Sequence, residues 1–109
     1  MEKLSEQELQ EMQAIDQNLH NLALQKQAFQ MELSETQSAL KEIEKSGEVF
    51  KLVGDLLIKK DKDKAKTELS EKVKLLEMRV KSIEKQEDIF SKRLEDLRKK
   101  ISSREKSAK

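Results

Sequence analysis

The chain has 109 residues, of which 41% are charged and only 35% are apolar, and it contains three phenylalanines but no tryptophan, tyrosine, proline or cysteine. This length fits one domain, 1–109, but the composition excludes the large apolar core of a compact globule, and the lack of cysteine excludes disulfides and thiolate metal sites. A net charge of +1 with interleaved signs excludes the strong field that would attract nucleic acid or acidic membranes.

The apolar residues are also too scattered for a membrane segment. No apolar run has the length of a signal-peptide core or of a membrane-spanning helix. We therefore expect a soluble protein of the cytoplasm that binds neither membranes nor nucleic acid. Disorder is the alternative for so polar a chain, but the regular spacing of the apolar residues favours a folded structure.

The first predicted element is a long helix over about residues 3–45. Its heptad positions a are Met12, Leu19, Lys26, Leu33 and Leu40, and its positions d are Ile15, Leu22, Phe29, Thr36 and Ile43. Eight of these ten residues are apolar, a pattern typical of a coiled coil. The helix is followed by Ser46 and Gly47, and we expect Gly47 to end it in a left-handed cap.

The second predicted element is a β-hairpin over about residues 49–60. Gly54 and Asp55 lie between two apolar runs, as the central residues of a type II′ turn do. In this register Val53 faces Leu56 and Lys51 faces Ile58. The apolar residues of the hairpin are Val49, Phe50, Leu52, Val53, Leu56, Leu57 and Ile58.

Both faces of this hairpin are largely apolar, because its apolar residues do not alternate with polar ones. A lone two-stranded hairpin is marginally stable in water, and its two outer edges are open for pairing with another chain. We therefore predict that the hairpin is the assembly element of an oligomer.

The third predicted element is a second long helix over about residues 62–103, with Asp61 or Asp63 as its N-cap. Its positions d are Leu69, Leu76, Ile83, Phe90 and Leu97, and its positions a are Val73, Val80, Glu87, Leu94 and Ile101. Nine of these ten residues are apolar, and the pattern ends near Ser102, beyond which we expect the tail to fray.

Because the hairpin reverses the chain, the two helices should form an antiparallel coiled coil. Lys26 and Glu87 are the charged residues within the two seams, and they lie at similar distances from the turn. They should therefore pair and fix the register of the helices, as opposite charges in a seam do. Glu8 and Arg104 should meet in the same way nearer the free helix ends.

The order of helix, apolar hairpin and helix, with the run Val49-Phe50-Lys51-Leu52-Val53-Gly54 followed by Leu56-Leu57-Ile58-Lys59-Lys60, resembles the prefoldin beta subunits, most like the archaeal type. The likeness extends to Ala65, Leu69, Leu75–Val80 and Gln86-Glu87. It implies a mainly α fold, a long antiparallel two-helix coiled coil joined by one β-hairpin that enters an intersubunit β-barrel. It also implies a hexamer of two alpha and four beta subunits, which holds unfolded client proteins without ATP and passes them to a group II chaperonin.

On this resemblance, residues of two regions carry the function. The oligomerisation residues are Val49, Phe50, Leu52, Val53, Leu56, Leu57 and Ile58, with Gly54 permitting the turn. The client-binding residues are the apolar ones near the free helix ends, Met1, Leu4, Leu9, Met12, Leu97 and Ile101. Leu4 and Leu9 lie outside the seam, at positions g and e, so that they are exposed unless something binds them.

Other functions have little support in the sequence. His20, the only histidine, falls on the outer face of the first helix, and the carboxylates lie on polar faces without a pocket to shift their pKa, so we expect no catalytic residue, cofactor or metal. The alternative to a chaperone subunit is a structural coiled-coil scaffold or tether that oligomerises through its hairpin and holds no clients.

Overall fold

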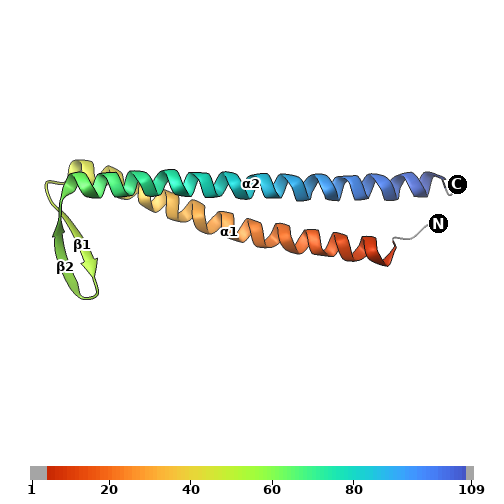
Figure 1. Ribbon diagram of the computed structural model, residues 1–109, viewed down its shortest axis with the longest axis horizontal. Coiled ribbons are helices and arrows are strands. Elements are labelled where there is room, and N and C mark those ends of the chain that lie inside the picture. The colour runs from red at the N-terminus through yellow and green to blue at the C-terminus, as the bar shows by residue number, and fades with distance from the viewer. Residues whose placement is uncertain (1–4, 108–109) are drawn as a thin grey trace. The chain divides into compact units, whose positions relative to one another are not determined.

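The protein consists of two long helices with a two-stranded hairpin between them (Figure 1). The computed structural model describes residues 5–107, and side chains through Arg104. Helix α1 spans Glu6–Lys45, strands β1 and β2 span Val49–Val53 and Leu56–Lys60, and helix α2 spans Lys62–Ser107. Over this part of the chain, neither helix combines the length and the apolar character that crossing a membrane requires.

Side chains cap the first turns of both helices. At the start of α1, the Ser5 hydroxyl accepts a hydrogen bond from the Glu8 amide at 3.1 Å, and the Glu8 carboxylate accepts one from the Ser5 amide at 3.2 Å. This reciprocal pair is a capping box. At the start of α2, the Asp61 carboxylate accepts a hydrogen bond from the Asp63 amide at 2.9 Å, so Asp61 is the N-cap.

The helix ends depart from the predicted ones in two places. Gly47 does not form the predicted left-handed cap, because its φ is not positive. The glycine with a positive φ is Gly54. Instead, the Ser46 hydroxyl donates to the Glu48 carbonyl at 2.6 Å, and the Ser46 amide donates to the Glu42 carbonyl at 3.0 Å. At the other end, α2 continues through the predicted frayed residues to Ser107, since no glycine or proline interrupts it.

The hairpin has the predicted register. Val53 pairs with Leu56, and Lys51 pairs with Ile58 in an antiparallel ladder. Gly54 has a φ of 59°, whereas Asp55 has no positive φ, which distinguishes a type II′ turn from a type I′ turn. The glycine is required here because a side chain at this φ would be strained.

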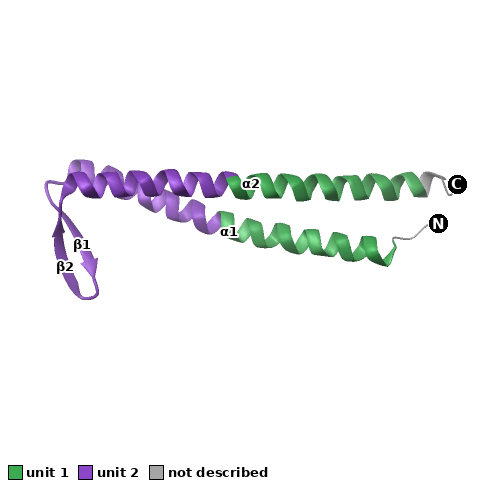
Figure 2. Cartoon of the chain, viewed as in Figure 1, with its two compact units in different colours: residues 1–26, 82–109 green, residues 27–81 purple. Residues whose placement is uncertain are grey.

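The chain divides into two units, each of which contains a segment of both helices (Figure 2). In unit 1, residues 1–26 and 82–109, the two helices pack through a core that contains Ile15, Leu94 and Leu97, with Met12, Leu19 and Phe90 against it. In unit 2, residues 27–81, the buried residues of the helices are Thr36, Ala65, Leu76 and Val80. The hairpin belongs to unit 2 and extends away from the helices of that unit (Figure 2).

Candidate functional surfaces

The first candidate surface is formed by the hairpin residues Val49, Phe50, Leu52, Val53, Leu56, Leu57 and Ile58, here called the hairpin surface. Except for Val49, which is half-buried, all of them are exposed. Leu52 and Leu57 face each other across the ladder, and 67% and 70% of their surface is open to solvent. An exposed apolar cluster of this kind marks a site of protein contact.

The backbone of the hairpin is also incompletely paired. β1 and β2 form a two-stranded sheet, so each strand has one edge without a neighbouring strand among the described residues 5–107. Such edges offer unpaired N–H and C=O groups to a strand of another molecule. The hairpin surface can therefore add both apolar contacts and a continued sheet to a partner.

The second candidate surface lies at the helix ends near Glu6 and Ser107, here called the tip. Met1 and Leu4, which the sequence placed there, lie outside the described residues. Leu9 is 46% exposed, Met12 and Ile101 are half-buried, and Leu97 is only 1% exposed. The structure thus makes Leu9 directly accessible and encloses Leu97 between the helices.

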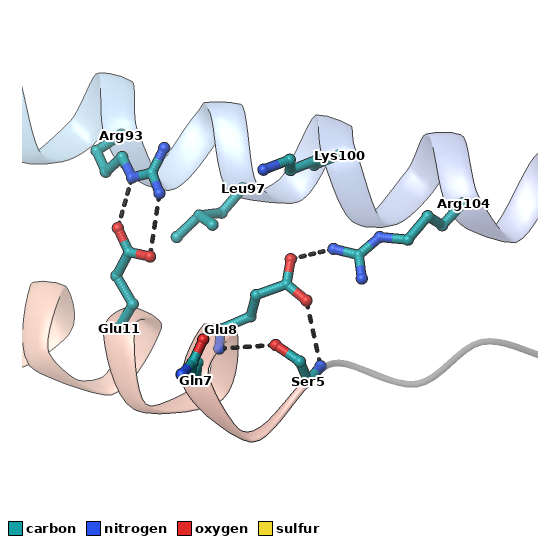
Figure 3. A pocket seen from close by; sticks show the side chains of 8 residues that line it. All are labelled: Ser5, Gln7, Glu8, Glu11, Arg93, Leu97, Lys100 and Arg104. Atoms are coloured by element: carbon teal, nitrogen blue, oxygen red, sulfur yellow. Dashed lines mark hydrogen bonds and ion pairs between the residues drawn. The ribbon is translucent and has the colours of Figure 1, made fainter.

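An open groove of about 470 Å³ runs between the two helices at the tip (Figure 3). Its lining residues are Ser5, Gln7, Glu8, Glu11, Arg93, Leu97, Lys100 and Arg104. Glu11 accepts two hydrogen bonds from Arg93, at 2.5 Å from Nε and 3.1 Å from Nη2, and Glu8 accepts one from Arg104. Both ion pairs connect α1 to α2, and we refer to them as the tip ion pairs.

The tip ion pairs shift the pKa values of their members. The hydrogen bond from Arg104, and then those from Ser5, lower the pKa of Glu8 from its ordinary 4.5 to about 2. The hydrogen bond with Arg93 lowers the pKa of Glu11. Because its pKa is lowered, Glu8 stabilises the paired tip at any pH above about 4.5, and this contribution is lost as the pH falls through about 2.

A third ion pair lies within the seam of unit 1. Lys26 Nζ is 2.8 Å from a carboxylate oxygen of Glu87, and both side chains are half-buried. The hydrogen bond with Glu87 raises the pKa of Lys26. The heptad pattern predicted that these two residues lie close together, and the structure confirms it. That the pair fixes the register of the two helices stays a prediction.

Sequence reasoning missed two further ion pairs between the helices and one exposed apolar residue. Glu11 pairs with Arg93, and Glu32 with Lys72 at 3.0 Å. All four residues occupy position g beside the seam, where opposite charges commonly meet across a coiled coil, so this signal was available. Ile89 is exposed on the outer face of α2, and the sequence pattern did not assign it to the seam or to a contact surface.

We expect the charges of Lys26 and Glu87 to be interdependent. Replacing Lys26 by leucine should lower the thermal midpoint of unfolding, because Glu87 would keep a half-buried charge without its partner. Adding Glu87→Leu should restore most of the loss, since the seam would then have an apolar layer. Thermal unfolding followed by circular dichroism measures both changes, and equal losses in the single and double variants would contradict the pairing.

Comparison with known proteins indicates the family of the chain. Residues 6–108 match the family model described as prefoldin subunit. Prefoldin subunit beta of Thermococcus onnurineus is 43% identical over 85% of this chain and 83% of that protein, and that of Thermococcus kodakarensis is 40% identical over 87% and 84%. The crystal structure of the prefoldin beta subunit from Thermococcus strain KS-1 superposes with a TM-score of 0.84 at 38% identity, covering 94% of this chain and 96% of that one. The chain therefore belongs to the prefoldin family, as a chaperone subunit of the beta type that is not an enzyme and that acts in a hetero-oligomer with other prefoldin subunits.

Proposed function

We propose that the hairpin surface builds this chain into a hexamer of four such subunits and two prefoldin alpha subunits. The observation that supports this most directly is the exposure of apolar side chains on both hairpin faces, together with two unpaired strand edges. Strands from neighbouring subunits would cover both features by continuing the sheet into a closed barrel, which leaves no edge open. A tether that holds no clients would assemble through the same hairpin surface. Client binding at the tip is therefore what distinguishes a chaperone subunit from a tether.

We propose further that the tip captures unfolded client proteins in the cytoplasm, without ATP, for delivery to a group II chaperonin. Leu9 supports this proposal, because it lies outside the seam and exposes an apolar side chain one residue from Glu8, which lines the groove that contains Leu97. Met12, which packs against the cluster that contains Leu97, adds a flexible thioether, and such side chains adapt to varied partners. A promiscuous, weak apolar site is what a chaperone that must release its client requires.

Assembly and aggregation measurements test this proposal in two steps. The chain is co-expressed with a prefoldin alpha subunit, and the mass of the complex is measured under native conditions. The assembled complex is then mixed with a denatured client, and light scattering reports aggregation. A complex of the proposed mass that leaves client aggregation unchanged would favour the tether.

We expect Leu9→Ser to weaken client capture by the assembled complex. Losing one half-exposed leucine from an apolar contact costs about 1 kcal/mol, so about fivefold more complex should be needed for equal suppression of aggregation. Leu24→Ser is the matched control, since Leu24 is similarly exposed on α1 but lies away from the tip groove. Equal effects of the two substitutions would argue against client binding at Leu9.

A further inference from the structure

The apolar residues at the tip are only partly available to a client in this structure. Leu97 is almost completely enclosed, and Met12 and Ile15 pack against it in the core of unit 1. Leu97 also lines the groove crossed by the two tip ion pairs (Figure 3). A client segment that reached Leu97 would have to separate the two helix ends.

We propose that the tip ion pairs hold the tip closed over this apolar seam, and that client capture uses an open tip in which Met12 and Leu97 are exposed. This inference rests on the proposed client binding at the tip and adds the contact that regulates it. The occupant of the open tip is an extended apolar segment of the unfolded client.

The sequence of the seam explains why the tip depends on these pairs. Between Met12 and its first residue, α1 has one further seam position, Glu8, and the capping residue Ser5 precedes the helix. Both residues are polar, so the first turns of α1 have no apolar seam residue to hold them against α2. Glu8 pairs with Arg104 of α2 and also caps α1 through Ser5. Separation of Glu8 from Arg104 therefore releases the part of α1 that covers the end of the seam.

The partial exposure of the tip ion pairs makes this contact reversible. Glu11 and Arg93 are 39% and 48% exposed, whereas Glu8 and Arg104 are 16% and 34% exposed, so water and salt compete more strongly with the first pair than with the second. The charged groups that face Glu8 in the groove are Glu11 on its own helix and Arg93, Lys100 and Arg104 on α2. Since the carboxylates of both pairs stay ionised at neutral pH, opening should respond to ionic strength and not to pH in the physiological range.

Hydrogen exchange of the complete chain, assembled with a prefoldin alpha subunit, measures opening without reference to any client. Glu8→Gln removes the charge but keeps a residue able to complete the capping box. We expect it to raise amide exchange in the first turns of α1 about twofold to fivefold at low salt, and to reduce the salt dependence to the part that the Glu11–Arg93 pair contributes. Asp88→Asn is the matched control, because it breaks the exposed Asp88–Lys92 pair within α2.

A covalent closure tests whether clients need the open tip. The natural chain has no cysteine, so Glu8→Cys with Arg104→Cys provides two unique thiols. A bifunctional maleimide of about the length of the ion pair would hold the tip shut, whereas a monofunctional maleimide would leave the same variant open. We expect the open form to suppress aggregation of a denatured client at least about twofold better than wild type, and the linked form to suppress it less than wild type.

The outcomes separate this inference from the proposed function. Unchanged exchange in Glu8→Gln would show that the pair does not close the tip. Equal client capture by the form linked with the bifunctional maleimide and the open form treated with the monofunctional maleimide would show that clients bind the closed tip. Both results overturn the inference while client binding stands, whereas a wild-type complex that captures no client at any salt concentration overturns both.

Discussion

Replacing Leu52 and Leu57 by serine should prevent assembly while leaving the helices folded. These two side chains face each other on one side of the ladder and are among the most exposed leucines of the chain. Burying two leucines contributes about 3–6 kcal/mol, and each 1.4 kcal/mol is tenfold in an equilibrium constant. The double substitution should therefore weaken association of each subunit by about 100-fold or more.

Native mass measurement and circular dichroism check this prediction together. The variant should remain a monomer when mixed with a prefoldin alpha subunit, with the helical signal of the wild type, because neither leucine contributes to the seam. Leu24→Ser with Met31→Ser removes two exposed apolar side chains from the outer face of α1 and should assemble normally. Assembly of the Leu52/Leu57 variant at wild-type concentrations would place the subunit contacts elsewhere.

The hairpin itself could be predicted from the sequence because its determinants are local. Gly54-Asp55 between two apolar runs fixes the turn, and the turn fixes which residues face each other. Its role in assembly was a prediction from the mismatch between an apolar ribbon and two polar helices. What covers the ribbon is not encoded in its own pattern, and only the resemblance to prefoldin indicated a partner.

The seam could also be predicted, since a heptad repeat brings its residues to one face of a helix. Leu76, Ile83 and Leu97 were assigned to it from spacing alone, and all three are buried. The pairing of Lys26 with Glu87 followed from their similar distances to the turn. The ion pairs beside the seam were missed because opposite charges were matched only at positions a and d.

The predictions for the helix ends were wrong because more than one residue near each end can decide where the helix stops. Gly47 can form a left-handed cap, but the Ser46 hydroxyl provides hydrogen bonds that end α1 without one. Residues 102–107 include no apolar residue, yet α2 continues through them, because Arg and Lys favour helices and Arg104 bonds to Glu8. The Ser5–Glu8 capping box was present in the sequence and was not used.

The accessibility of the tip could not be read from the sequence. A leucine at position d contributes equally well to a closed seam or to a surface that opens for a client, and the spacing is the same. In the structure, Leu97 lies in the core of unit 1, whereas Leu9 lies outside it. This difference in exposure between Leu9 and Leu97 is the reason for proposing a tip that opens instead of a fixed binding surface.

Truncation of Leu76 should strongly destabilise the packed helices. Leu76 is 1% exposed, whereas its neighbour Leu75 is 47% exposed. Leu76→Ala removes buried methyl groups and leaves a cavity, so we expect a loss of about 2–5 kcal/mol in the free energy of unfolding. Leu75→Ala removes the same atoms from a largely solvated site and should change it by about 0.5 kcal/mol or less.

Both substitutions should be measured in the Leu52→Ser, Leu57→Ser background, because assembly would otherwise stabilise every variant by mass action and hide the difference. Urea unfolding followed by circular dichroism gives the midpoint and the slope, and an unchanged slope assigns the shift to stability. Comparable losses from Leu75 and Leu76 would mean that the heptad seam does not hold α1 and α2 together in unit 2. The hairpin would then lack the firm support that a subunit presenting it to several partners requires.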